Sequence, residues 1–246
     1  LLDTHGLAKT APWLASVWLV GIVPITLALI RPDPVALGWQ PDGGRTSDAV
    51  TARPVESVPY SDAVRTRFFL TVTVGFMLIM FAQVGGIQQL VKLVEERVGS
   101  SAATIATTVL AGASVVARLA GGQIAARVSM ARLALMFAAL QGTALILIAL
   151  IDLRIPLFLS IVLFGATVGN LLMLHPLLIG QEFGPREYAR IFSRSQFVSF
   201  VGTAVGPYAL GVIRDASGGY TAAYLTAGVL SISGALVLPR RVRGDT

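Results

Sequence analysis

The sequence contains no cysteine, two histidines and little charge. Charged residues make up 13% of its 246 residues and hydrophobic residues 54%, whereas a soluble globular domain carries about 25% charged residues. The absence of cysteine excludes a disulfide scaffold and a thiolate metal site, and the hydrophobicity excludes a disordered chain. The net charge of +6 comes from basic residues that lie between apolar runs rather than in one patch. This composition argues against a water-soluble enzyme, and we expect no nucleic-acid partner.

Seven apolar runs are each long enough to cross a bilayer as a helix, which needs about 20 residues. Their hydrophobicity is continuous rather than alternating, which excludes the spans of a β-barrel. We therefore predict an all-α, polytopic membrane protein whose first partner is the lipid bilayer. The predicted spans are Ala11–Ile30, Phe68–Val91, Ala102–Ala126, Met130–Ile151, Ile155–Ile179, Ser195–Ile213 and Tyr220–Leu238.

One long connection divides the chain. Residues 31–67 contain Pro32, Pro34, Pro41 and Pro54, which predicts a flexible linker rather than a packed domain. The other connections are short and predict antiparallel neighbouring spans. The predicted parts are an N-terminal segment with the first span (1–30), the linker (31–67), a lobe of six spans (68–238) and a tail (239–246).

Lysine and arginine are unequally divided between the two sides of this topology. With the linker in the cytoplasm, 13 of them lie on the cytoplasmic side, 5 lie outside, and Arg118 lies within a span. The positive-inside rule then places the N-terminus outside and the C-terminus in the cytoplasm. We expect the membrane to be a plasma or inner membrane.

Small residues are concentrated in Ala102–Ala126 and Ser195–Ile213, which predicts helices packed inside a bundle. Gly202 and Gly206 share one helix face, as do Gly165 and Gly169, and such faces permit close contact between helices. Packing alone is the alternative reading of these residues.

One span, a long basic linker and six closely connected spans resemble the second half of a major facilitator superfamily transporter. The loop GGQIAARVSMAR is similar to a basic loop of that family: Gly122, Arg127 and Arg132 match, and Ala126 stands where an acidic residue is usual. The resemblance implies that the chain holds the second six-helix lobe and the last helix of a truncated first lobe, so that an N-terminal lobe is a missing partner.

Residues 202–220 resemble the glycine- and proline-rich eleventh helix of the same family. Gly206, Pro207 and Gly211 lie in the expected register. The resemblance implies that this helix, together with the basic loop, acts in gating at the interface between the two lobes.

Arg118 lies about four residues beyond the middle of its span, or ~6 Å at 1.5 Å per residue. A charge at the centre of a bilayer costs roughly 2.5–3.5 kcal/mol or more, and a guanidinium binds a carboxylate with two hydrogen bonds. We therefore expect Arg118 to bind an anionic group of the substrate, with Ser114 on the same face. SVVARLAGG resembles the eighth helix of monocarboxylate transporters, in which an arginine contacts the carboxylate; Ser114 replaces a frequent aspartate. Alternatively, Arg118 extends to the interface or bonds a neighbouring helix.

His175 is the candidate for proton coupling, because imidazole titrates near physiological pH. A hydrogen bond to a neighbouring helix is the alternative. Gln88, Gln89 and Asn170 are candidate secondary contacts to the substrate, and they are equally consistent with hydrogen bonds between helices.

The sequence therefore predicts a secondary active transporter that moves a small solute, such as a monocarboxylate or another organic anion, by alternating access with a coupled proton. A drug or metabolite efflux carrier of the same superfamily and a seven-helix receptor or sensor are the alternatives. We predict no enzyme activity, cofactor or metal, because the spans lack paired catalytic groups.

Overall fold

The structure is a computed structural model that describes residues 2–29, 57–125 and 128–243. Seven of its helices are long and apolar enough to cross a membrane, in agreement with the predicted spans, and the described residues form no strand. The long helices are α1 (Leu2–Leu29), α3 (Arg67–Val98), α4 (Ser100–Ala125), α5 (Met130–Leu150), α6 (Arg154–Phe183), α7 (Tyr188–Ser217) and α8 (Tyr220–Val237), and α2 (Tyr60–Ala63) is a single turn.

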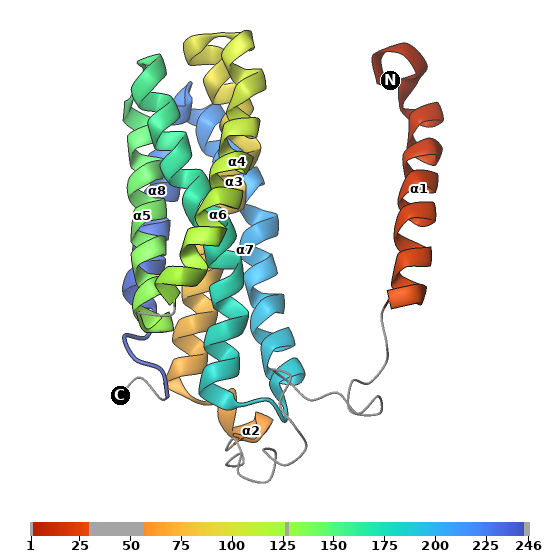
Figure 1. Ribbon diagram of the computed structural model, residues 1–246. Helices are drawn as coiled ribbons and strands as arrows, with labels where there is room; N and C mark the ends of the chain where they lie inside the picture. Colours follow the sequence, from red (N-terminus) through yellow and green to blue (C-terminus); the bar gives the residue numbers. More distant parts are fainter. Residues whose placement is uncertain (1, 30–56, 126–127, 244–246) are drawn as a thin grey trace. The chain divides into compact units, whose positions relative to one another are not determined.

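The chain separates into two compact units, Leu1–Pro54 and Val55–Thr246. The described part of the first unit is α1, which contains Pro12 and Pro24. The second unit is a bundle of six antiparallel helices (Figure 1). In it, α3 packs against α4, α7 and α8, α6 packs against α4 and α5, and α5 packs against α8. We call the end with the turns at Gly99, 151–153 and 218–219 the hairpin end, and the opposite end the linker end.

Several helices continue beyond the predicted spans. Helix α3 ends at Val98 rather than Val91, and α7 runs from Tyr188 to Ser217 rather than from Ser195 to Ile213. The apolar pattern detects only the part that crosses lipid, whereas polar residues continue the helix beyond it. Gly99, Gly184 and Gly218 end α3, α6 and α7 with φ of 94°, 78° and 73°, a backbone conformation that glycine adopts without strain.

The glycine faces predicted to permit close packing do so. A Cβ on Gly202 or Gly206 of α7 would collide with the carbonyl oxygen of Met77 or Phe81 of α3. A Cβ on Gly165 of α6 would lie 2.5 Å from the carbonyl oxygen of Leu110 of α4. These backbones approach one another at distances that exclude a larger side chain.

The two small-residue spans pack closely against neighbouring helices, but on one side only. Only 28% of the apolar stretch in α4 and 22% of that in α7 is buried, against 56% in α3 and 61% in α6. Small residues allow close contact on one side of a helix, but they do not determine whether its opposite side is covered. The opposite sides of α4 and α7 expose large apolar residues such as Leu119 and Tyr208.

The last part of the predicted linker is also more ordered than a flexible chain. The Val58 N–H donates to Phe183 O at 3.0 Å, and the Tyr60 N–H donates to Glu187 Oε2 at 3.2 Å. The guanidinium of Arg190 lies 4.2 Å from the centre of the Tyr60 ring. This segment, which includes α2, therefore rests on the connection between α6 and α7.

Candidate functional site

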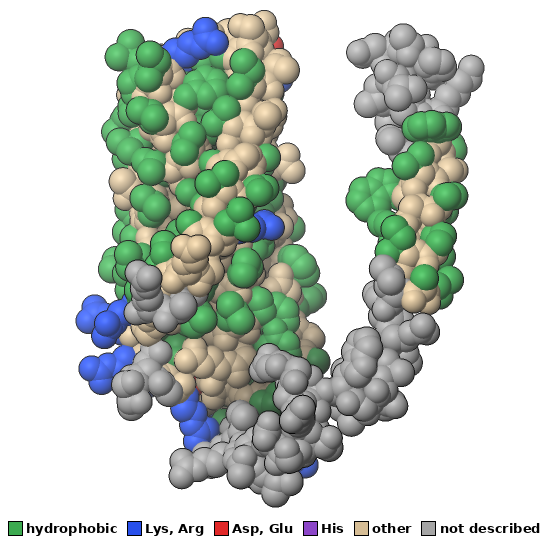
Figure 2. Space-filling model, viewed as in Figure 1, with side chains coloured by type: hydrophobic (Ala, Val, Ile, Leu, Met, Phe, Trp, Pro, Cys, Tyr) green, Lys and Arg blue, Asp and Glu red, His purple; other side chains and the backbone are tan. Residues whose placement is uncertain are grey.

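Arg118 lies on α4, seven residues before Ala125, which is about 10 Å of helix, and its side chain is exposed. In the part of the chain that the structure describes, it forms no hydrogen bond or ion pair. Its stem crosses α6 at Gly169, where a Cβ would collide with Arg118 Nε. Figure 2 shows a basic side chain part-way along the bundle, apart from those at the two ends. Arg118 is thus a free cation within the length of a spanning helix.

Asn170 of α6 lies beside Arg118. Its Nδ2 donates to the carbonyl oxygens of Ala117, at 3.1 Å, and Ala166, at 2.9 Å, and its side chain is 5% exposed. Its Oδ1 occupies the space that a side chain at Gly121 would need. Asn170 therefore fixes α6 to α4 at the residue before Arg118, so that it positions the arginine rather than offering its amide hydrogens to a ligand.

Ser114 lies one turn before Arg118 on α4, as predicted, but it is 7% exposed and faces the bundle. Gln83 of α3 is 2% exposed, and its Oε1 has no hydrogen-bond partner among the described residues. At a rise of 1.5 Å per residue, the distance along the helix from the hairpin end is about 24 Å for Gln83, 27 Å for Arg118 and 24 Å for Asn170. Their helices α3, α4 and α6 thus carry polar side chains at one depth.

Gln88 and Gln89 lie nearer the hairpin end, about 12 Å from the depth of Arg118 by the same count. Gln88 is exposed. Gln89 Nε2 donates to Pro207 O of α7 at 3.2 Å, and Gly211 lies against the same amide. The structure does not bring these two glutamines together with Arg118, and Gln89 instead joins α3 to α7.

His175 lies at the centre of a hydrogen-bonded network that joins three helices. Its Nε2 is 2.8 Å from Ser195 Oγ of α7, and Ser195 Oγ is 2.8 Å from Thr73 Oγ1 of α3. The imidazole stacks on Phe76, with ring centres 4.4 Å apart, and meets the edge of Phe192 at 5.3 Å. Only 3% of His175 is exposed.

Sequence reasoning did not find Thr73 and Ser195. Serine and threonine within a helix usually bond their own carbonyls one turn back, as Ser199 does with Ser195 O. A hydroxyl that bridges helices therefore looks the same in the sequence as one that does not. The only signal was the polar character of Ser195 and its neighbour Gln196 at the predicted start of a span.

The residues predicted for the lobe interface lie in two places. Gly206, Pro207 and Gly211 line the contact between α7 and α3, so the opposite side of α7 is the one that remains exposed. Gly122 is exposed with nothing near it, and Arg132 is exposed in the first turn of α5. Arg127 lies outside the described residues.

Gln141 of α5 is another buried amide, and its Nε2 donates to Ile79 O at 3.1 Å and to Ser231 Oγ at 3.0 Å. This amide fixes α5 to α3 and α8. No group of three or more histidine, aspartate or glutamate side chains that could hold a metal is present among the described residues.

No family model and no curated protein matches the chain. Among solved structures, the chain is similar to the crystal structure of the E. coli fucose:proton symporter FucP, with a TM-score of 0.69 and 15% sequence identity. The match covers 94% of this chain and 55% of that protein, so the chain spans little more than half of its length. The chain therefore shares the all-α fold of that structure over nearly its whole length, with seven membrane-length helices among its described residues.

Proposed function

We propose that this chain forms part of a secondary active transporter that moves a small organic anion, such as a monocarboxylate, by alternating access. The observation that carries the proposal is the state of Arg118. It is a charged side chain within a membrane-length helix, it is exposed, and no described side chain neutralises it. A charge in contact with acyl chains would cost roughly 2.5–3.5 kcal/mol or more, so the face that carries it must meet water or a ligand.

The surroundings of Arg118 support a binding role. The bond from Asn170 to Ala117 O holds α4 against α6, and the aliphatic stem of Arg118 rests on Gly169. The backbone and the stem are thereby held, while none of the five guanidinium N–H donors is bonded to a described residue. Such a group suits a carboxylate, which accepts two parallel hydrogen bonds from it.

Proton symport is the coupling we propose, with His175 as the residue that carries the proton. The solved neighbour is named as a proton symporter, and His175 bridges α6 and α7, with Thr73 of α3 as the third member of its network. Protonation would turn Nε2 into an obligatory donor to Ser195, and would thereby change the hydrogen bonding that joins α3, α6 and α7.

The deciding experiment is uptake of a panel of radiolabelled carboxylates by the complete gene product in proteoliposomes, with Arg118→Ala and Arg118→Lys. We expect Arg118→Ala to lower uptake by at least about tenfold, since a charge-assisted bond contributes about 1.5–3 kcal/mol. Arg118→Lys should retain part of the uptake, because lysine keeps the charge but lacks the planar pair of donors.

Arg65→Ala is the matched control, since Arg65 is an exposed arginine at the linker end and its removal should leave uptake unchanged. If both Arg118 variants transport anions at the wild-type rate, the anion-binding proposal fails. Uptake of uncharged solutes alone, unaffected at Arg118, would instead favour a carrier for neutral substrates.

A further inference from the structure

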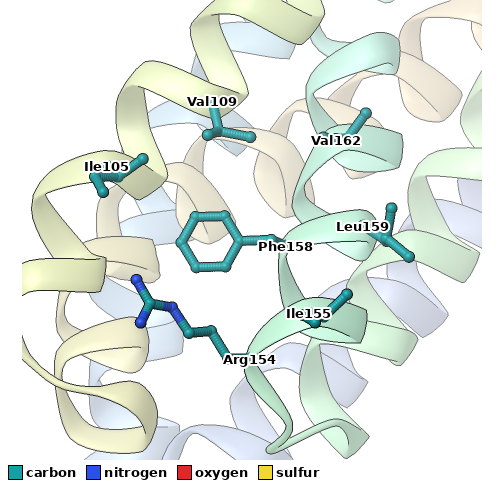
Figure 3. Close-up of a pocket in the computed structure, with 7 residues that line it drawn as sticks. All are labelled: Ile105, Val109, Arg154, Ile155, Phe158, Leu159 and Val162. Atoms are coloured by element: carbon teal, nitrogen blue, oxygen red, sulfur yellow. The ribbon is translucent and has the colours of Figure 1, made fainter.

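Helices α4 and α6 leave an outward-facing groove near the hairpin end, with a volume of about 410 Å³ (Figure 3). Apolar side chains form both walls, and the one charged residue that lines it is Arg154. Figure 3 shows the ring of Phe158 between the two walls and the guanidinium of Arg154 at one end of the groove. The walls are Ile105 and Val109 of α4 and Phe158, Leu159 and Val162 of α6.

The groove has a polar mouth and a closed apolar end. From Arg154 to Val162 it follows eight residues of α6, or about 12 Å. Just beyond Val162, the two backbones approach so closely that a Cβ on Gly165 would lie 2.5 Å from Leu110 O, and this contact marks the inner end of the groove. One leaflet of the hydrocarbon core is about 15 Å deep. With Arg154 placed at the bilayer surface, the groove would cover most of that depth.

The charge at the mouth is available to an anion. Arg154 is exposed and has no hydrogen bond or ion pair within the described ranges. Asp152, the nearest acid in the sequence, has its Oδ1 3.2 Å from Arg97 Nε. Leu153 provides no side-chain cap to α6, and the first backbone N–H groups of a helix lack acceptors one turn back. The helix dipole adds to the attraction for a negative group at this point.

We propose that this groove binds a phospholipid, with one acyl chain along Phe158, Leu159 and Val162 and the phosphate on Arg154. An apolar trough one leaflet deep with a single cation at the bilayer surface has the shape and charge of such a molecule, and an anionic headgroup adds to the attraction. The proposal requires that α4 and α6 cross a bilayer, and it does not depend on which solute the protein moves.

The first test compares lipid retention by native mass spectrometry on the purified complete protein, titrated separately with phosphatidylglycerol and with phosphatidylcholine of the same acyl chains. We expect preferential retention of phosphatidylglycerol by about fivefold, the ratio for one arginine at a membrane surface. Arg154→Ala should abolish the preference. Arg186→Ala, an exposed arginine at the other end of the bundle, should retain it.

The second test addresses the acyl-chain part of the groove. Val162→Trp would fill it, whereas Val212→Trp places the same ring on an exposed position of α7 outside it. We expect Val162→Trp alone to reduce retention of both lipids, with both variants retaining the wild-type melting temperature. Equal retention of the two lipids by the wild type, or a preference that survives Arg154→Ala, overturns the headgroup contact. Unchanged retention in Val162→Trp overturns the acyl-chain site.

Discussion

Arg118 and His175 are both ionisable side chains deep within spanning helices, but their surroundings differ. Arg118 is exposed and free of partners among the described residues, whereas His175 is enclosed by Phe76 and Phe192 and bonded to Ser195. A free cation can meet a substrate directly. An enclosed imidazole can act only through the helices that it joins, so the two residues would contribute to transport at different steps.

We predict that His175→Ala abolishes the pH dependence of uptake. Imidazole in water titrates between about pH 5 and 8, and proton symport should make wild-type uptake rise as the external pH falls. Without the imidazole, uptake should be slow and nearly independent of pH. The measurement is initial uptake in proteoliposomes across that pH range, with a fixed internal pH.

Ser195→Ala serves as the matched variant for that experiment, because it removes the hydrogen-bond partner but keeps the ring. Its uptake should still depend on pH. A pH profile in His175→Ala that matches the wild type would remove His175 from the coupling mechanism and leave it a packing residue.

The candidate site could be predicted from the sequence only in part. Arg118 and Asn170 interrupt long apolar runs, so their polarity marks them as exceptions, and the structure places them side by side. Gln89 interrupts an apolar run in the same way but bonds α7, because periodicity shows that a side chain is polar without showing which helix it faces. The polarity of Thr73 and Ser195 is not exceptional in this way, since hydroxyl side chains are common in membrane helices.

At the scale of helix pairs, the contact between α4 and α6 depends on glycine in two different ways. A Cβ at Gly165 would meet the backbone of Leu110, which cannot move without separating the helices. A Cβ at Gly169 would meet the flexible stem of Arg118. The same substitution one turn apart should therefore affect stability at one position and function at the other.

We predict that Gly165→Ala lowers the free energy of unfolding by about 1–3 kcal/mol, as overpacking does. Gly169→Ala should leave stability nearly unchanged but reduce anion uptake, because it displaces the Arg118 side chain. Thermal unfolding in detergent and uptake in proteoliposomes measure the two effects. A stable Gly165→Ala protein would show that the helices have room to separate, and normal uptake by Gly169→Ala would show that the position of Arg118 does not matter.

Arg97 fixes the end of α5 at the hairpin end of the bundle. Its guanidinium donates to the carbonyl oxygens of Ile148, Ala149 and Ile151 at 2.6, 2.9 and 3.0 Å. These carbonyl oxygens accept no hydrogen bond from within α5, because the last C=O groups of a helix have no N–H group one turn further along the chain. A cation at this position also complements the helix dipole.

Replacing Arg97 by alanine should therefore destabilise the bundle by about 2–4 kcal/mol, because several charge-assisted hydrogen bonds are lost together. Lys92→Ala is the control: Lys92 pairs with Glu95 at 2.7 Å, but both side chains are exposed, and such pairs contribute about 0–1 kcal/mol. Melting temperatures in detergent compare them. Equal melting temperatures would mean that water replaces the guanidinium at this helix end without cost.

The spans were predictable because roughly 20 apolar residues have few explanations other than a membrane helix. The helix ends were harder to predict. Helix α3 continues through the charged residues Lys92–Arg97 until Gly99, whereas the apolar pattern ends before them. The packing role of Gly202 and Gly206 was confirmed. The exposed opposite side of α7 was not predicted, since a sequence read one helix at a time does not show which sides remain uncovered.

At the scale of the whole molecule, charge differs between the two ends of the bundle. At the hairpin end, two arginines are paired with acids and Arg154 is not, among the described residues: Arg214 lies 2.6 Å from Glu96 and 3.1 Å from Asp215, and Arg97 lies 3.2 Å from Asp152. The linker end carries exposed arginines such as Arg65, Arg186 and Arg240. By the positive-inside rule we predict that the linker end faces the cytoplasm.

The absence of cysteine makes this orientation directly measurable, since any thiol introduced is the only one in the chain. Ser217→Cys places a thiol at the exposed end of α7 at the hairpin end, and Ser61→Cys places one in α2 at the linker end. In intact cells, a membrane-impermeant maleimide should label Ser217→Cys and not Ser61→Cys, and permeabilisation should make both reactive. Labelling of Ser61→Cys alone in intact cells would show that the topology is the reverse of the predicted one. The Arg154 groove would then lie in the cytoplasmic leaflet, and the helix contacts would be unchanged.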